Sequence, residues 1–312
     1  MIVDRDNFRG IYVIVVTPFT EHLELDEDAL VATLKFCFAA GVQGVVATAI
    51  ASEAGYLSEA ERRRSAEIVV REATAAGVPA VVAVSSASWK LSTALAEHAT
   101  GIGASAIMAT PPTFQPASAG EIRTFYSELA KVSDLPLILQ NGFGPSATPM
   151  SPALLWEIMQ EQPTARFVKE ETLHPAQSIG ELRRLAGDTL YGVMGGMAGR
   201  TLMQEVRHGA CGTMPACEFA DIHVALWNAI ESGPPEQARL IFRLLLPLLD
   251  LERTFGMPIA KEVLRMRGVI PTAAWRQTGC RPLDAETKAE IAVLLDDAAS
   301  LMMPAYPHSA TA

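Results

Sequence analysis

The chain contains few cysteines, few charged residues and few aromatic residues. Of its 312 residues, 4 are cysteine, 19% are charged and 6% are aromatic. No two cysteines have the Cys-x-x-Cys spacing of redox or zinc motifs, so we expect reduced thiols in the core rather than disulfides or a metal site. Positive charge is also scarce, because 25 Lys and Arg face 35 Asp and Glu, for a net charge of -10. Nucleic-acid binding requires clustered Lys and Arg in excess, which excludes that class of protein.

Long apolar segments are absent as well. The longest apolar runs, Ile11–Val16 and Leu244–Leu249, are far shorter than the roughly 20 residues of a membrane-spanning helix. Charged residues from Asp4 to Arg9 interrupt the N-terminus, where a secretion signal would be continuously apolar. With 49% hydrophobic residues, the chain has ample material for a large core. We expect a soluble, cytoplasmic protein with no membrane contact.

Short apolar runs alternate with longer stretches of helical periodicity. The runs are almost uniformly apolar, which is typical of parallel strands covered on both faces. Eight such units predict an α/β fold, a closed (β/α)8 TIM barrel rather than an open sheet. The eight expected strands are Ile11–Val16, Gly44–Thr48, Ala80–Val84, Ala106–Ala109, Leu135–Gln140, Arg166–Lys169, Leu190–Val193 and Cys211–Met214.

Helix start signals stand between these runs. Asp26, Ser58 and Ser88 each precede a helical pattern, and Ser58 with Glu61 forms a capping-box pattern. Further helices are expected from the regions of Ser118, Ser151, Pro175 and Gly199. Helical patterns without intervening strands then cover 235–251, 258–269 and 284–301. We therefore expect a catalytic barrel over 1–231, a C-terminal helical extension over 232–303 and a flexible tail over 304–312.

Catalytic groups of a (β/α)8 barrel lie at the carboxyl ends of the strands, where the loops converge on one cavity. Lys169 closes the sixth predicted strand and is the one lysine of six placed on such a strand. A buried cation costs several kcal/mol, so a lysine is not placed there for packing. A buried amine loses its proton more readily, and the neutral amine attacks a carbonyl carbon. The alternative interpretation is a structural ion pair with Glu170 or Glu171. Strand alternation places Lys169 and Glu171 on one face if the strand continues, and that carboxylate could then stabilise an iminium or transfer a proton.

Motifs along nearly the whole chain have a characteristic order and spacing. They are Gly10-Ile11, Thr17-Pro18-Phe19, Ala40–Gly44, Ser52-Glu53, Leu57–Arg62, Pro111-Pro112, Phe167–Glu170 and Gly209–Gly212. In this respect the chain resembles the dihydrodipicolinate synthase / N-acetylneuraminate lyase family of Schiff-base lyases. The resemblance implies that Lys169 forms the Schiff base and that the protein is a homo-oligomer, commonly a tetramer.

Several motifs depart from the family pattern. The Gly-Thr-Thr-Gly-Glu loop, which holds the substrate carboxylate through backbone amides and hydroxyls, is Ala49–Glu53 here. The family's tyrosine at the fifth strand is Gln140, and the arginine that follows aligns with Pro145. The Pro-Tyr-Tyr segment becomes Pro112-Thr113-Phe114. The family's tyrosine–threonine–tyrosine proton relay cannot form at these positions, which argues against dihydrodipicolinate synthase and sialic acid lyase activity.

One branch of the family shares these departures. Gln140, Ser52-Glu53 and Lys169–Thr172 are similar to L-2-keto-3-deoxyarabonate dehydratases and related sugar-acid dehydratases. The resemblance implies that Lys169 condenses with the C2 ketone of a 2-keto-3-deoxy acid, after which C3 loses a proton and C4 loses its hydroxyl as water. Glu171 is the expected acid and base, and Gln140 orients the imine or a substrate hydroxyl.

Further residues are expected to contact the substrate. Ser52 and the amides around it would hold the C1 carboxylate, and Glu218 would reach the distal end. For Glu218 the alternative is a carboxylate that stabilises a helix N-terminus. The expected substrate-binding residues are Ile50, Ala51, Ser52, Asn141, Gly195 and Glu218.

Other activities remain open from the sequence. Cleavage between C3 and C4 of the same intermediate would make the protein a pyruvate-dependent aldolase, and a condensation like that of dihydrodipicolinate synthase with altered specificity is a related possibility. A metal-dependent lyase would need clustered ligands at strand ends, whereas the six histidines fall mostly on expected helices or loops. A non-catalytic barrel that binds a keto acid is the third class. We expect no metal and no cofactor, with a small 2-keto acid as the one ligand.

Overall fold

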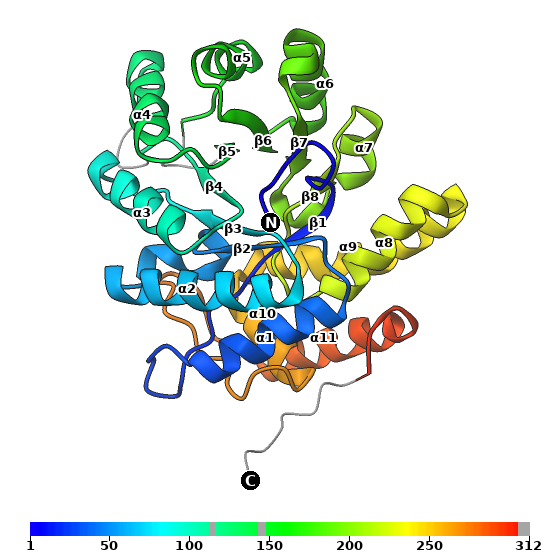
Figure 1. Cartoon of the computed structure of the whole chain (residues 1–312). Coiled ribbons are helices and arrows are strands. Elements are labelled where there is room, and N and C mark those ends of the chain that lie inside the picture. The colour runs from blue at the N-terminus through cyan, green and yellow to red at the C-terminus, as the bar shows by residue number, and fades with distance from the viewer. Residues whose placement is uncertain (113–115, 143–147, 305–312) are drawn as a thin grey trace.

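The computed structural model describes residues 1–112, 116–142 and 148–304. Eight parallel strands close into a barrel in chain order, with β1 paired to both β2 and β8 (Figure 1). The predicted TIM barrel is therefore confirmed. The strands are β1 (Gly10–Ile14), β2 (Gly44–Ala47), β3 (Ala80–Ala83), β4 (Ala106–Ala109), β5 (Leu137–Gly142), β6 (Ala165–Glu171), β7 (Gly192–Gly195) and β8 (Gly212–Thr213).

A ring of helices surrounds the strands. Each buries one face against the outside of the barrel, which accounts for the uniformly apolar strands. The helices of this ring are α1 (Glu27–Ala39), α2 (Glu59–Ala76), α3 (Trp89–Gly101), α4 (Ala119–Val132), α5 (Pro152–Glu161), α6 (Pro175–Ala186), α7 (Leu202–Arg207) and α8 (Ala220–Ser232).

The predicted helix starts follow from local capping. The carboxylate of Asp26 accepts from the backbone N–H of Ala29, and the Ser58–Glu61 capping box is complete. Ser151 caps α5 in the same way as Asp26 caps α1. Ser88 precedes α3 as predicted, but its hydroxyl makes no capping hydrogen bond.

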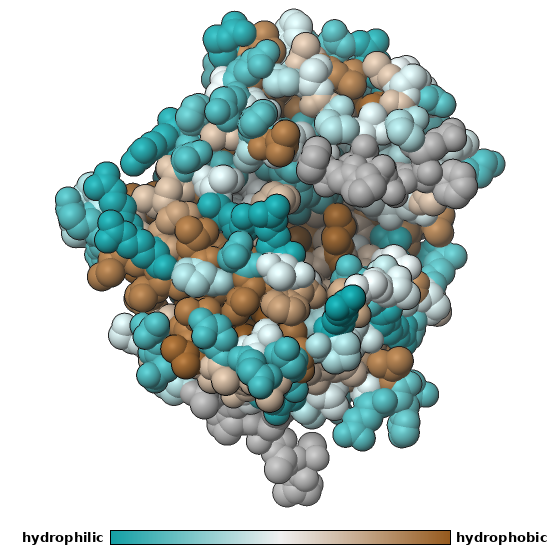
Figure 2. Space-filling model, turned by 180° about the vertical axis from the view of Figure 1, so that it is seen from behind, coloured by the Kyte–Doolittle hydropathy of each residue, from teal (hydrophilic) through white to brown (hydrophobic). Residues whose placement is uncertain are grey.

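The barrel interior is a separate apolar cluster from the layer between strands and helices. Tyr12, Val46, Met108 and Phe167 belong to it, at alternate positions of their strands. Phe8, from the segment before β1, packs against Phe167 inside the barrel, with ring centroids 4.7 Å apart. Polar groups in the barrel are thereby displaced toward the carboxyl ends of the strands. From behind, the molecule is hollowed near its centre, and both hydrophilic and hydrophobic residues border the hollow (Figure 2).

The C-terminal extension is helical, as predicted. It consists of α9 (Pro235–Phe255), α10 (Met257–Met266) and α11 (Ala285–Asp297). Helix α9 packs against α8, α10 and α11, so the extension covers one side of the barrel (Figure 1). The division at 231/232 stays a prediction, and the expected tail lies outside the described residues except for Pro304. Within the described ranges, no helix combines the length and the hydrophobicity needed to cross a bilayer.

Candidate active site

Lys169 lies inside the barrel at the carboxyl end of β6. Phe167 belongs to the interior cluster, so alternation puts Lys169 and Glu171 on the same inner face, and β6 does continue to Glu171. Lys169 is buried, and its Nζ lies 3.1 Å from Oε2 of Glu171. The amine therefore faces a carboxylate within the barrel rather than the helical layer outside it.

Gln140 completes this group from the neighbouring strand. In the register of β5 against β6, Gln140 stands opposite Lys169 and Gly142 opposite Glu171. The side-chain amide of Gln140 donates from Nε2 to Oε1 of Glu171 at 2.5 Å. One carboxylate oxygen thus contacts the amine and the other contacts an amide, which fixes the carboxylate in position. The three residues predicted to be catalytic lie together.

This geometry contains the ion pair of the alternative interpretation and also an arrangement suited to covalent chemistry. An ion pair with no further purpose is favourable in the interior only with excellent geometry and further hydrogen bonds. Lys169 and Glu171 instead lie near the rim of the barrel, where Glu171 keeps 12% of its side chain exposed. A carboxylate beside an amine, both at the open end of a barrel, can accept a proton from a substrate bound to the amine.

Glu170 of β6 and Asn141 of β5 point to the opposite side of their strands, away from the barrel interior. Glu170 is fully buried, and one carboxylate oxygen accepts from Asn141 Nδ2 at 2.7 Å. The other oxygen accepts the N–H of Thr172 at 2.9 Å and its hydroxyl. Burial raises the pKa of Glu170. Asn141 also bonds both backbone groups of Met150, so its amide is committed on the face of β5 opposite Gln140. The structure therefore does not bring Asn141 together with Lys169.

Two successive glycines at the end of β7 leave room for two carboxylates. A Cβ on Gly196 would lie 2.3 Å from Oε2 of Glu171, and one on Gly195 would lie 1.8 Å from Oε2 of Glu205. Real Cβ contacts are much longer, so a side chain at either position would force the neighbouring carboxylate to move. Gly195 thus faces Glu205 of α7, a residue that we did not predict, and contributes space rather than a substrate contact.

Glu205 is a buried carboxylate without a cation partner among the described residues. Its Oε1 accepts the hydroxyl of Thr201 at 2.6 Å, while its Oε2 has no hydrogen-bond partner in the part of the chain that the structure describes. Burial raises the pKa of Glu205 to about 7. Between its ordinary value of 4.5 and about 7, the folded protein holds a proton here that the unfolded chain has released. Folding stability therefore falls as pH rises through this range.

Glu205→Gln is expected to remove this part of the pH dependence, because the amide keeps the shape without a titratable proton. The variant should match the wild type near about pH 5 and exceed it in free energy of unfolding near about pH 8 by up to roughly 3 kcal/mol. Urea denaturation at the two pH values measures the difference. If stability depends on pH in the variant as it does in the wild type, Glu205 is not the group that causes this pH dependence.

The predicted carboxylate loop connects β2 to α2. Ser52 is buried, and its hydroxyl donates to the backbone oxygen of Val15 at 2.6 Å, while Thr17 Oγ1 donates to the backbone oxygen of Ser52 at 2.7 Å. The Ser52 hydroxyl thus supports the loop from β1. The backbone N–H groups of Ile50 and Ala51 have no acceptor among the described residues. These amides, rather than the hydroxyl, are available to a ligand.

Glu218 follows β8 and is completely buried. Burial raises the pKa of its carboxyl to about 7, and neither carboxylate oxygen has a hydrogen-bond partner within the described ranges. Its backbone oxygen accepts from Arg267, which also forms a buried ion pair with Asp221 of α8. The structure therefore places Glu218 under the rim, apart from the contacts that join Lys169, Glu171 and Gln140.

A second buried lysine, like Glu205, was not predicted from the sequence. Lys261 of α10 is 0% exposed and is paired with Glu53 at the end of the carboxylate loop. A lysine within the apolar stretch Ile259–Leu264 is a signal that could have identified it, as a glutamate on the buried face of α7 could have identified Glu205. Both come from helices, whereas the strand-end rule considers strands alone.

The expectations about metals and about the proton relay stay predictions. In the part of the chain that the structure describes, no three or more His, Cys, Asp or Glu side chains gather into a metal-binding group. Thr113 and Phe114, which bear on the missing relay, and Pro145, which aligns with the family's arginine, lie outside the described residues.

Comparison with known proteins supports the architecture. An L-2-keto-3-deoxyarabonate dehydratase from Azospirillum brasilense is 30% identical over 288 residues, covering 91% of this chain and 92% of its own. A 4-hydroxy-tetrahydrodipicolinate synthase from Methanopyrus kandleri is 28% identical over 77% of this chain and 79% of its own. The crystal structure of a dihydrodipicolinate synthase from Rhodopseudomonas palustris has the same fold, with a TM-score of 0.87 and 24% identity over 95% of this chain and 99% of its own. The model of the dihydrodipicolinate synthetase family matches residues 7–298, and the chain belongs to this family of lyases and synthases.

Proposed function

We propose that the protein is a Schiff-base lyase that removes water from a 2-keto-3-deoxy sugar acid. The observation that carries the proposal is the contact of Glu171 with both Lys169 and Gln140 at the carboxyl end of the barrel. An amine, a carboxylate that exchanges protons and a neutral amide are the groups that such an elimination requires.

The reaction begins with attack of the neutral Nζ of Lys169 on the C2 ketone. Water leaves from C2, and a protonated imine joins the substrate to the enzyme. This imine withdraws electrons from C3, so a C3 proton becomes acidic enough for a carboxylate to remove it. The Oε2 of Glu171 is 3.1 Å from Nζ and therefore close to where C3 would lie.

Elimination follows from the resulting enamine. Its electrons move toward C4 and expel the C4 hydroxyl, which takes the proton that Glu171 holds and leaves as water. Glu171 is thus base and then acid, so that one hydrogen from C3 and the hydroxyl from C4 depart together. Hydrolysis of the remaining imine returns Lys169 to its free form. Gln140 holds Glu171 through Oε1 and directs the other oxygen toward the substrate.

The carboxylate loop supports binding of the substrate at C1. The N–H groups of Ile50 and Ala51, which have no acceptor in the described ranges, present two donors of the kind that bind carboxylates. Ser52 acts indirectly here, because its hydroxyl donates to Val15. Of the other predicted binding residues, Asn141 and Gly195 support neighbouring carboxylates, and a contact of Glu218 with the substrate is not required.

Dehydration is favoured over aldol cleavage by two observations. The Azospirillum relative is a dehydratase, and Gln140 stands where the family has the tyrosine that serves as proton shuttle in aldol chemistry. The second candidate is an aldolase or a condensing enzyme, which the similarity to a 4-hydroxy-tetrahydrodipicolinate synthase favours. Both candidates share the lysine imine. A homotetrameric assembly remains a prediction from the family resemblance, and a cytoplasmic location remains a prediction from the sequence.

Product analysis separates these reactions. With L-2-keto-3-deoxyarabonate, the proposal predicts one product that retains the whole carbon chain and has lost one water. Mass spectrometry of the products detects it, and a lactate dehydrogenase assay detects pyruvate. Pyruvate formed in proportion to the substrate consumed would reject dehydration in favour of cleavage.

A further inference from the structure

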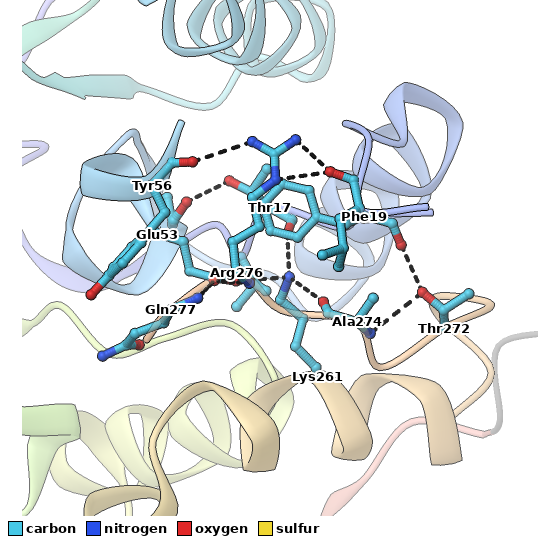
Figure 3. Close-up of polar contacts among 12 residues, drawn as sticks. Thr17, Phe19, Glu53, Tyr56, Lys261, Thr272, Ala274, Arg276 and Gln277 are labelled. Carbon is cyan, nitrogen blue, oxygen red and sulfur yellow. Dashed lines mark hydrogen bonds and ion pairs between the residues drawn. The ribbon is translucent and has the colours of Figure 1, made fainter. Parts of the chain in front are cut away.

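Lys261 lies at the junction between the C-terminal extension and the rim of the barrel. It belongs to α10 and points toward the residues that follow β1 and β2 (Figure 3). Its side chain is fully buried. Its Nζ donates to the backbone oxygen of Thr17, which follows β1, and at 3.0 Å to the backbone oxygen of Ala274. The same nitrogen lies 3.0 Å from Oε1 of Glu53 and 4.3 Å from the ring centroid of Phe19. One ammonium group thus connects the helical extension with the segments that follow two barrel strands.

Glu53 is held from its other side by the backbone of the extension. Its Oε2 accepts the N–H groups of Arg276 and Gln277, each at 2.7 Å. The guanidinium of Arg276 in turn bonds the carboxylate of Glu61 and the backbone oxygen of Leu23. The segment that follows α10 therefore lies against the carboxylate loop, anchors Glu53 through backbone N–H groups and bonds the neighbouring Glu61 through the Arg276 side chain (Figure 3).

The loop that Glu53 terminates is conformationally strained. Thr48 and Glu53, on either side of residues 49–52, both adopt left-handed backbone angles, with φ of 55° and 54°. Residues other than glycine avoid this region, and β-branched threonine does so most strongly. Such a loop keeps its shape only where the surrounding structure enforces it. At the end next to α2, the contacts that enforce it come from Lys261, Arg276 and Gln277.

Fold stability alone is a weak reason for this arrangement. Replacing a buried ion pair with apolar groups is often neutral or stabilising, because two charges must lose their hydration. Burial lowers the pKa of Lys261 to about 8, because the charged amine loses its hydration. The pair does, however, fix the direction of Glu53. Through Glu53 it fixes the loop in which the Ile50 and Ala51 amides have no acceptor among the residues that the structure describes.

We propose that Lys261 is a positioning residue which, through Glu53, holds the loop 49–53 in the conformation that binds the substrate carboxylate. The C-terminal extension then determines affinity for the carboxylate without touching the substrate. This inference rests on the proposed function, because it assumes that the substrate forms an imine with Lys169 and presents its carboxylate to the loop.

The test compares two ketones that differ in the carboxylate. Borohydride trapping of the imine is measured against concentration for pyruvate and for hydroxyacetone, which has no carboxylate. For Lys261→Met, the half-saturating concentration of pyruvate should rise roughly 10- to 100-fold, as small misplacements of binding groups do, while the value for hydroxyacetone stays unchanged. The matched control is Lys288→Met, since the half-exposed Lys288 pairs with Glu262 of the same extension, at 3.7 Å, and has no contact with Glu53 in the described residues.

A second variant keeps the test independent of folding. Glu53→Gln has the same shape and retains an oxygen for the two N–H groups, but it loses the ion pair, so it should reproduce the selective effect on pyruvate. If Lys261→Met does not fold, the result with Glu53→Gln tests the inference in its place. Equal losses with both ketones, or no loss with pyruvate, would overturn the inference. Absence of trapping in the wild type would instead refute the proposed function itself.

Discussion

Replacing Lys169 with alanine is expected to lower turnover of a 2-keto-3-deoxy acid by on the order of 10⁴-fold or more, because the covalent pathway disappears with its nucleophile. The remaining groups at the site can bind the substrate but cannot form the imine that makes C3 acidic. The loss should appear in kcat, since binding through the carboxylate loop does not involve the amine. Steady-state kinetics with the wild type and the variant measure the effect.

The appropriate control is a lysine in an ordinary surface ion pair. Lys131 is 63% exposed and pairs with Glu128 in α4, so Lys131→Ala should change stability by no more than about 1 kcal/mol and leave activity intact. Comparable circular dichroism spectra would establish that Lys169→Ala is folded. A folded Lys169→Ala variant with more than a tenth of the wild-type kcat would be incompatible with a nucleophilic role.

Glu171→Gln is expected to lower kcat by roughly 10²- to 10⁴-fold, which is the usual contribution of a positioned acid or base. The amide is nearly the same shape as the carboxylate but cannot take the C3 proton. Imine formation requires only the amine, so borohydride trapping with pyruvate should persist in this variant. Trapping with little turnover is the expected signature, and equal loss of trapping and turnover would assign Glu171 to another role.

Gly196 offers a second way to disturb the same carboxylate. A Cβ there would lie 2.3 Å from Oε2 of Glu171, so Gly196→Ala must displace the group that faces Lys169. On the other side, a Cβ on Gly142 would lie 4.0 Å from Oε1, an ordinary contact. Gly196→Ala should therefore reduce kcat while Gly142→Ala leaves Glu171 in place. Equal activities of the two variants would contradict the position assigned to Glu171.

The barrel was predictable from the sequence because strand burial on both faces produces uniformly apolar runs. The runs at 44–48, 80–84 and 106–109 correspond to β2, β3 and β4 within one residue at either end. The seventh strand was predicted at Leu190–Val193, but it runs from Gly192 to Gly195. Leu and Tyr have a higher strand propensity than Gly, which explains the shift. Gly195 and Gly196 end the apolar run in the sequence, and they are also the residues that leave space for the carboxylates of Glu205 and Glu171. The prediction thus failed at a position where the site imposes its own requirement.

The catalytic group was only partly predictable. Alternation within β6 links Lys169 to Glu171 by local geometry, whereas the contact of Gln140 with Glu171 depends on the register between two strands. The contact from Lys261 to Thr17 joins residues separated by 244 positions, and no periodicity in the sequence encodes such a pairing. Residues on the strands can therefore be inferred from local pattern, and those supplied by helices require the folded chain.

The central claim is that the amine of Lys169 forms the covalent intermediate, and borohydride reduction in the presence of pyruvate followed by peptide mapping tests it most directly. The account predicts one reduced adduct on the peptide that contains Lys169, and none in Lys169→Ala. A protein that gains no mass, or an adduct on another lysine such as Lys261, would contradict it.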